Sequence, residues 1–329
     1  MRAFSHDTKA HEPSRHMRVS RAHLLTAFVH PRAVTTKSHP SAITGILLTC
    51  LAVVFFGLLD SSVRYVAAVV PVLMALWIRY LVHTTLTMGM LYKKTGQWLP
   101  RSNNWPWQIV RACCFVMSNA FAFLSLRYIM IAEFTAIALI APVVVSVLAM
   151  LVLHEKLSIA RWLLLALALS GALVIVRPGN VGLGWYILFP LMQVVSNVIY
   201  LLVTAHVAQY DEPLTTHLYT GVLGLVLASC VLPFFWQTPD FHWAIWATMI
   251  AGGICGTVGH LLLIHAYRFA KSTVLMPYLY VQVAIATLLG WLLFDNIPDE
   301  ISFFGIAMIV CSGVGGAILT LRPTKPRAS

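Results

Sequence analysis

The sequence predicts an all-α integral membrane protein whose ten transmembrane helices are arranged as two inverted five-helix repeats. Of its 329 residues, 59% are hydrophobic and 10% are charged, and the mean hydropathy is +0.82. A soluble domain carries about 25% Asp, Glu, Lys and Arg. Ten long apolar segments follow Pro40, and similar blocks recur about 141 residues apart. The bilayer is therefore the expected solvent for most of the chain.

The composition excludes a soluble enzyme, a nucleic-acid-binding protein and a disordered scaffold. The formal net charge is +11, but residues 1–40 hold seven of the basic residues, and most of the others lie in short loops between apolar segments. Basic loops beside membrane spans report orientation and do not indicate a polyanionic ligand. The six cysteines lie in apolar segments without a CxxC pair, so we expect buried thiols, no metal and no cofactor.

Residues 1–41 form a polar, basic and histidine-rich segment that we expect to be a disordered cytoplasmic tail. Its longest apolar run, Leu24 to Val29, is too short for the core of a signal peptide. The spacing of its histidines does not fit a metal site.

Each apolar segment after this tail is long enough to span the bilayer, which takes about 20 residues. Turn-forming and charged residues separate the segments, for example Lys93 to Gly96, Asp211 to Pro213 and Pro298 to Glu300. The predicted spans lie near residues 42–66, 72–92, 106–126, 130–152, 159–176, 183–205, 214–235, 243–267, 273–294 and 302–321.

The distribution of basic residues predicts the orientation of these spans. With the N-terminus in the cytoplasm, most of the 22 Lys and Arg residues fall on the cytoplasmic side, while acidic residues such as Asp295 and Asp299 fall outside. We therefore expect a multi-pass protein of the bacterial cytoplasmic (inner) membrane with both termini in the cytoplasm.

The internal repeat divides the membrane region into residues 42–178 and 179–322, with a short cytoplasmic tail at 323–329. Leu126-Arg127-Tyr128 begins a block that Tyr267-Arg268-Phe269 begins again. Because each repeat holds five spans, the second must enter the membrane with opposite orientation. Inverted repeats are typical of transporters that open alternately to the two sides.

Three local patterns resemble the EamA family of the drug/metabolite transporter superfamily. They are Trp77-Ile78-Arg79-Tyr80, the stretch from Arg127-Tyr128 to Ala141-Pro142, and the His154-Glu155-Lys156-Leu157 turn. The resemblance covers about residues 42–322, although the second repeat has Asp295-Asn296-Ile297-Pro298 where the first has the Glu155 turn. It implies two five-helix domains and the transport of small metabolites such as amino acids and their derivatives, cationic drugs or riboflavin.

Charged side chains inside the spans are candidates for function, because burying one costs about 2.5–3.5 kcal/mol on insertion scales. Arg79 is either an anchor for a carboxylate or a partner in a fixed ion pair; Arg111 also lies within a span. Asp60 and Arg64 are four residues apart, which suits a local salt bridge or a gate. Arg127 and Glu133 flank the turn into span 4, where Glu133 either stabilises a helix N-terminus or couples transport to protons.

Other polar and aromatic side chains within the spans either line a central cavity or join neighbouring helices. The proposed substrate-binding residues besides Arg79 are Trp77, Asn119, Gln193, Asn197, His260, Tyr280 and Gln282. Aromatic rings such as Tyr200 suit a flat substrate, and Pro142 and Pro277 are candidate hinges at roughly matching places in the two repeats.

The leading hypothesis is a secondary transporter that moves a small metabolite, an amino acid or derivative or a riboflavin-like planar compound, by alternating access. No ATP-binding motif is present, so an ion gradient, with a proton as the candidate ion, exchange or the substrate gradient must drive transport. The alternatives are an intramembrane lipid-modifying enzyme and a channel. The expected partners are the substrate and the lipid bilayer, not nucleic acid, and no signal for a particular oligomeric state is present.

Overall fold

The structure is a computed structural model that describes residues 40–66, 69–102, 104–128, 131–178, 184–234, 242–295 and 297–321. In these ranges the chain forms helices and no strand. The helices are α2 (Pro40–Val66), α3 (Val72–Thr95), α4 (Trp105–Tyr128), α5 (Ile131–Ala138), α6 (Ala141–Val152), α7 (Ile159–Val176), η1 (Gly184–Ile187), α8 (Leu188–Val207), α9 (Pro213–Val231), η2 (Leu232–Phe234), α10 (Trp243–Phe269), α11 (Ser272–Leu279), α12 (Val281–Phe294) and α13 (Glu300–Leu321). Both predicted tails lie outside the described residues, apart from Pro40 and Ser41.

Helical segments occupy all ten predicted spans, so the predicted all-α membrane fold is confirmed. Within the described ranges, eight segments are long and apolar enough to cross a membrane by length and composition. The two that fall below this threshold are α3 and α4. These helices carry Arg79 and Arg111, whose charges lower the mean hydropathy of the segments around them. The two spans of lowest mean hydropathy therefore place two arginine side chains in the membrane interior.

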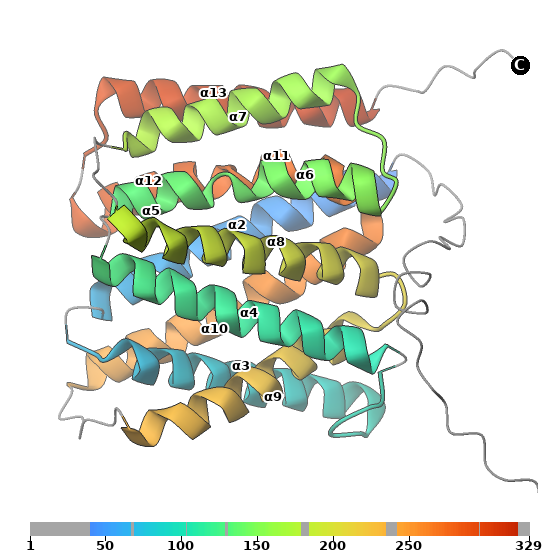
Figure 1. Cartoon of the computed structure of the whole chain (residues 1–329), viewed down its shortest axis with the longest axis vertical. Helices are drawn as coiled ribbons and strands as arrows, with labels where there is room; N and C mark the ends of the chain where they lie inside the picture. Colours follow the sequence, from blue (N-terminus) through green and yellow to red (C-terminus); the bar gives the residue numbers. More distant parts are fainter. Residues whose placement is uncertain are drawn as a thin grey trace, which may run out of the picture. The chain divides into compact units, whose positions relative to one another are not determined.

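The helices pair across the two repeats in a pattern that is unchanged when the repeats are exchanged. Helix α3 packs against α9 and α7 against α13, and in both pairs the partners hold equivalent places in the two repeats (Figure 1). Spans 4 and 9, which are also equivalent, meet through α6 and α11. The contact of α2 with α10 has its counterpart in the contact of α4 with α8. This exchange symmetry is what two inverted copies of one five-helix unit produce.

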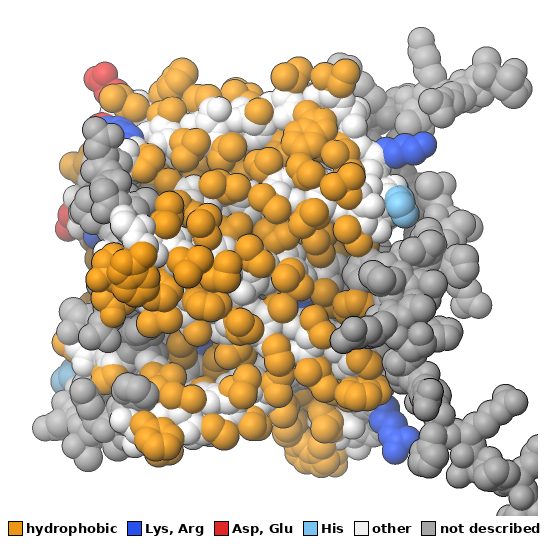
Figure 2. Space-filling model, viewed as in Figure 1, with side chains coloured by type: hydrophobic (Ala, Val, Ile, Leu, Met, Phe, Trp, Pro, Cys, Tyr) orange, Lys and Arg blue, Asp and Glu red, His pale blue; other side chains and the backbone are white. Residues whose placement is uncertain are grey.

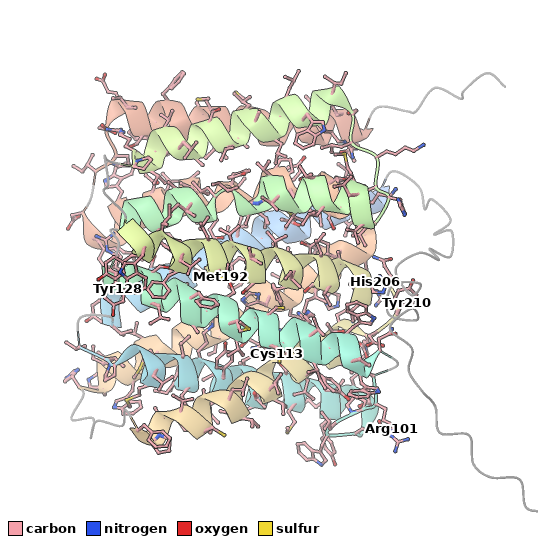
Figure 3. The ribbon with its side chains drawn as sticks, in the orientation of Figure 1. Arg101, Cys113, Tyr128, Met192, His206 and Tyr210 are labelled. Carbon is pink, nitrogen blue, oxygen red and sulfur yellow. The ribbon has the colours of Figure 1, made fainter. Side chains whose placement is uncertain are left out.

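The two ends of the bundle differ in charge. Figure 3 places Tyr128 at one end and Arg101, His206 and Tyr210 at the other, and we call these the Tyr128 end and the Arg101 end. On the face drawn in Figure 2, hydrophobic side chains cover the middle, acidic side chains lie at the Tyr128 end and basic side chains dominate the Arg101 end. An apolar band between two charged ends is the surface that a bilayer requires.

Span 4 and span 9 are each interrupted at equivalent positions. Val143 N bonds to the carbonyl of Ile140 and not to that of Leu139, so the turn before Pro142 leaves the Leu139 oxygen without a helical donor. The corresponding interruption is at Tyr280, which is 141 residues further along, between α11 and α12. The Tyr280 hydroxyl donates to the Leu139 oxygen at 2.7 Å. The break in span 9 thus supplies the donor that the break in span 4 lacks.

Close backbone contact joins the outermost helices, α7 and α13. A Cβ atom on Gly171 would lie 2.7 Å from the Gly305 carbonyl oxygen, and one on Gly305 would lie 2.6 Å from that of Gly171. Small residues let helix backbones approach in this way within lipid. At the end of α7, Arg177 donates to Asp299, and this guanidinium holds the pKa of the Asp299 carboxyl well below its usual range. The pair is exposed and contributes little to stability.

A carboxylate from the first repeat caps a helix of the second. The Glu155 carboxylate accepts hydrogen bonds from the backbone amides of Ser272 at 3.2 Å and Thr273 at 2.9 Å. These amides open α11 and have no donor role within the helix. The negative charge also interacts favourably with the helix N-terminus. The acidic turn of the first repeat therefore holds the start of span 9.

Replacing Glu155 by alanine is expected to lower the stability of the folded protein by about 1–2 kcal/mol, because two helix-start amides lose their acceptor. Thermal unfolding of the purified protein in detergent measures this change. Lys156→Ala, one residue further along on an exposed side chain, is the control and should change stability by less than about 0.5 kcal/mol. Equal unfolding midpoints for the two variants would show that the cap does not stabilise the fold.

Candidate functional site

The Arg79 guanidinium lies at the meeting point of three helices inside the bundle. From α3, its Nη1 donates to Asn119 Oδ1 on α4 at 3.5 Å, and its Nη2 lies 3.2 Å from His260 Nε2 on α10. Asn119 is itself oriented by a bond from its Nδ2 to the Phe115 carbonyl. Three of the residues proposed from the sequence, Arg79, Asn119 and His260, are thus brought together.

The contact with Arg79 determines the protonation state of His260. A guanidinium only donates hydrogen bonds, so His260 Nε2 must accept and the imidazole is neutral with its proton on Nδ1. Nδ1 lies 3.4 Å from the Tyr200 hydroxyl, which accepts that proton's hydrogen bond. The rings of Phe56 and Phe115 lie 4.7 and 4.9 Å from the imidazole. Aromatic rings from α2 and α4 therefore flank a neutral imidazole.

A second guanidinium, that of Arg111, joins three helices directly beside this group. Arg111 is fully buried, and its Nε donates to Thr204 Oγ1 on α8 at 2.7 Å. On α9 it donates to the Thr216 carbonyl at 2.9 Å and to the Thr220 hydroxyl. Its Nη2 donates to the Tyr200 hydroxyl at 3.3 Å, and its charge lies 5.0 Å from the centre of that ring. Arg111 therefore fixes α4, α8 and α9 to one another and orients Tyr200.

Neither guanidinium forms an ion pair within the described residues. The two ion pairs found there, Lys94 with Glu212 and Arg177 with Asp299, lie at the ends of helices. Asp60 on α2 lies within electrostatic range of Arg79, but its carboxylate accepts a hydrogen bond from Gln282 Nε2 at 2.8 Å. The described part of the site thus holds two permanent cations whose hydrogen-bond partners are all neutral.

A small cavity leads to Arg79 from the Tyr128 end. Its volume is about 60 Å³, roughly the space of two water molecules. Arg79 lies at its inner limit, and the walls come from the last turns of α2 and the first turns of α3 and α10; they include Ser62, Val66, Ala75, Thr248, Met249, Gly252 and Gly253. A Cβ on Gly256 would lie 3.4 Å from Arg79 Nε, so this glycine leaves room beside the guanidinium.

A cluster of hydrogen-bonded polar side chains lies between Arg111 and the Arg101 end. Gln108 on α4 is fully buried and donates to Asp211 Oδ2 at 2.9 Å and to Thr216 Oγ1 at 3.0 Å. Asp211, in the α8–α9 turn, also accepts from the Ser102 hydroxyl. Beside this cluster, His83 on α3 stacks on His217 of α9 with 3.8 Å between ring centres.

Four of the other residues proposed for substrate binding, Trp77, Gln193, Tyr280 and Gln282, bond to other helices and not to Arg79. The Trp77 indole donates to Ser229 Oγ on α9 at 2.9 Å. Gln193 on α8 donates to Ser118 Oγ on α4 at 3.4 Å, and Asn197 lies half-buried one turn further along α8. Tyr280 bonds to the break in span 4, and Gln282 bonds to Asp60.

The expected Asp60–Arg64 salt bridge does not form. Gln282 on α12 donates a hydrogen bond to the Asp60 carboxylate. The Arg64 guanidinium lies 4.6 Å from the centre of the Phe294 ring, which is also on α12. Contacts with a neighbouring helix thus replace the local pair that the four-residue spacing suggested. The backbones of Arg127 and Glu133 lie in α4 and α5, but their side chains are outside the described part of the structure, and so are the roles proposed for them.

The sequence patterns assign no role to Arg111, Phe56 or Phe115 and do not indicate the His83–His217 pair. The rule that selected Arg79, a charge within a span, applies equally to Arg111. Phe56 and Phe115 carried no such signal, because a phenylalanine facing lipid and one facing a site are the same in composition. Tyr200 was identified only as one of several rings able to stack on a substrate.

Comparison with known proteins agrees with this architecture. A profile described as the EamA-like transporter family matches residues 43–177 and, a second time, residues 184–317. A solved crystal structure superposes with a TM-score of 0.74 at 17% sequence identity, covering 84% of this chain and 99% of the other. At that identity the likeness concerns the fold alone.

Curated relatives carry the names of transporters for different small molecules. A riboflavin transporter of Vibrio cholerae is 23% identical over 286 residues, which is 85% of this chain and 94% of that protein. A pseudopaline exporter of Pseudomonas aeruginosa is 23% identical over 271 residues, or 81% of this chain and 93% of that protein. An S-adenosylmethionine uptake transporter of Rickettsia prowazekii is 20% identical over 177 residues, or 54% and 59%.

Proposed function

The chain belongs to the EamA-like transporter family, and from this premise we propose that it binds a carboxylate-bearing metabolite with a flat ring at Arg79 and carries it across the membrane by alternating access. The predicted class, a multi-pass membrane transporter of a small metabolite, is confirmed by the family and by its relatives. These relatives are named as transporters and not as enzymes. Their substrates differ chemically, so the ligand class proposed here comes from the site.

The observation that carries the proposal is the unpaired charge of Arg79. Its guanidinium contacts an amide oxygen and a neutral imidazole, and no described carboxylate forms an ion pair with it. A planar guanidinium binds a carboxylate through two parallel hydrogen bonds, which are about twice as strong as those to neutral groups. Phe115, whose ring centre lies 5.8 Å from the Arg79 guanidinium carbon, and Phe56 offer faces for the ring of the ligand. Asn119 and His260 complete the proposed ligand contacts.

The two ends of the site differ in access, and this difference supports alternating access. The cavity reaches Arg79 from the Tyr128 end, whereas buried Gln108 and Asp211 separate Arg111 from the Arg101 end. Because the two repeats are inverted copies of one unit, the same sequence can adopt a second conformation, in which the Tyr128 end is closed and the Arg101 end is open. We propose that the Asp60–Gln282 bond, which links the first repeat to the second, breaks and reforms during this change.

We further propose that the Arg101 end faces the cytoplasm of a bacterial cell, so that both termini are cytoplasmic. The basic side chains at this end, which Figure 2 shows on one face, support that orientation. Lys93, Lys94, Arg101, Lys156, Arg161, Arg268 and Lys271 all lie in or beside its turns.

Ligand binding to the purified protein tests the proposal. Thermal unfolding is measured in the presence of matched pairs that differ only in a carboxylate or its neutral amide, such as hippurate with hippuramide and indole-3-acetate with indole-3-acetamide, and with riboflavin. We expect the carboxylates to raise the unfolding temperature more than their amides. Stabilisation by riboflavin and by the amides alone, or none by any compound, would reject an anionic substrate.

A further inference from the structure

His260 is a titratable group that its contacts with Arg79 and Tyr200 keep neutral. Arg79 donates to its Nε2 at 3.2 Å, and Arg111 donates to Tyr200, whose hydroxyl lies 3.4 Å from its Nδ1. A proton added to Nε2 would break the bond from Arg79 and would place a third positive charge beside two permanent ones. In a membrane interior such like charges repel strongly, because little water screens them.

An anion at Arg79 reverses this situation. A carboxylate at this place accepts the hydrogen bonds of the Arg79 guanidinium, so that the lone pair on His260 Nε2 no longer has a donor. That nitrogen then lies beside a negative charge, and an imidazolium donates to a carboxylate in a charge-assisted hydrogen bond. The proton comes from water and adds to the Nε2 lone pair, while Nδ1 keeps its own proton and its bond to Tyr200.

We propose that His260 is a proton-binding site that is filled only together with an anionic ligand, so that the protein carries one proton with each carboxylate. This inference rests on the carboxylate site proposed above and adds to it the identity of the coupling ion. It assigns proton coupling to His260, whereas the sequence suggested Glu133 for that role. Proton and anion together leave the charge of the site unchanged, so the loaded carrier meets no new electrostatic barrier when it changes conformation.

Groups from five neighbouring helices surround His260 and are consistent with this role. Helix α3 contributes Arg79 and His83, α4 contributes Arg111, α8 contributes Tyr200, and α9 contributes His217. Helix α2 contributes the uncharged ring of Phe56 and, one turn further along, the Asp60 carboxylate, which lies within electrostatic range of Arg79. The Asp60 carboxylate bonds to Gln282 and does not contact His260 among the described side chains, so the ligand must supply the negative charge that an imidazolium needs.

Thermodynamic linkage gives the expected size of the effect. If the anion favours protonation, the proton must favour anion binding by the same factor. With one proton taken up per ligand, the dissociation constant for the anion rises by up to about tenfold for each unit of pH increase. A neutral ligand has no such linkage, and its affinity should not depend on pH.

Calorimetric titration of the full-length protein with hippurate between pH 6 and pH 8 tests the inference, because the hippurate carboxylate stays ionised over this range. For the wild type we expect weaker binding as pH rises and the uptake of nearly one proton, which is read from titrations in buffers of different ionisation enthalpy. His260→Gln can still accept from Arg79 but cannot titrate, so its hippurate affinity should not change with pH. His265→Gln is the control on the same helix, where the ring bonds only to the Leu261 carbonyl, and it should retain the pH dependence.

Two results would overturn the inference, and they are distinguishable. Hippurate binding that does not vary with pH in the wild type, or that varies equally in His260→Gln, rejects His260 as the proton site and leaves the carboxylate site in place. Failure of hippurate to bind at any pH rejects the proposed anionic ligand and this inference with it. Absence of proton uptake by the wild type also rejects the inference, whether or not His260→Gln folds.

Discussion

Replacing Arg79 by methionine is expected to weaken the binding of hippurate by roughly 10- to 150-fold. The physical reason is the loss of a charge-assisted hydrogen-bonded pair, which contributes about 1.5–3 kcal/mol. Methionine keeps much of the length of the side chain, so packing beside Gly256 should change little. Hippuramide, which carries no charge, should lose much less affinity, and calorimetric titration of both ligands measures the difference.

Arg79→Lys separates the charge of the side chain from its shape. Lysine keeps the positive charge but not the planar fork, so we expect an affinity between those of the wild type and the methionine variant. Arg268→Met, on the exposed last turn of α10, serves as the matched control and should bind hippurate as the wild type does. The same loss for hippurate and hippuramide in Arg79→Met would mean that this guanidinium shapes the site without binding a carboxylate.

Replacing Arg111 by alanine is expected to lower the stability of the folded protein by roughly 3–5 kcal/mol. A fully buried large side chain is removed, and truncations of that size cost about 2–5 kcal/mol. The bonds to Thr204, Thr216, Thr220 and Tyr200 are lost as well. The hydroxyls of Thr204 and Thr220 each keep a bond to a carbonyl of their own helix. Thermal or denaturant unfolding in detergent measures the change.

Arg111→Met identifies the part of this loss of stability that comes from the cavity left by alanine. Methionine refills much of the volume, so the methionine variant should be clearly more stable than the alanine variant. Arg101→Ala, on an exposed residue of the α3–α4 connection, is the control and should leave stability nearly unchanged. An Arg111→Ala protein as stable as the wild type would contradict the view that this residue holds α4, α8 and α9 together.

The spans were predictable from sequence because membrane insertion depends on a local property, the length of an apolar run. Even α3 and α4 were found, since Arg79 and Arg111 interrupt their apolar runs only briefly. Arg79 was also predictable as a candidate site residue, because a charge in hydrocarbon needs a partner or a ligand. Its neighbours Asn119 and His260 followed from the same criterion applied to neutral polar groups.

Contacts between distant helices were not predictable from the chain alone. The spacing of Asp60 and Arg64 favours a pair on one helix, but the structure brings Gln282 to the aspartate and Phe294 to the arginine. Tyr280 was proposed as a ligand contact because of its ring. Its position at the break of span 9 instead directs its hydroxyl to the carbonyl freed at Leu139, and only the packing of the two repeats shows this.

Counterflow in proteoliposomes tests the central claim, that two inverted repeats carry a carboxylate bound at Arg79 alternately to each side of the membrane. Vesicles are loaded with unlabelled hippurate, and the uptake of labelled hippurate from outside is followed at pH 7.5, with protein-free vesicles as the blank. We expect saturable uptake that internal hippurate stimulates and that Arg79→Met reduces at least tenfold. Uptake that rises linearly with concentration and ignores the internal hippurate, or equal counterflow by Arg79→Met, would contradict the account.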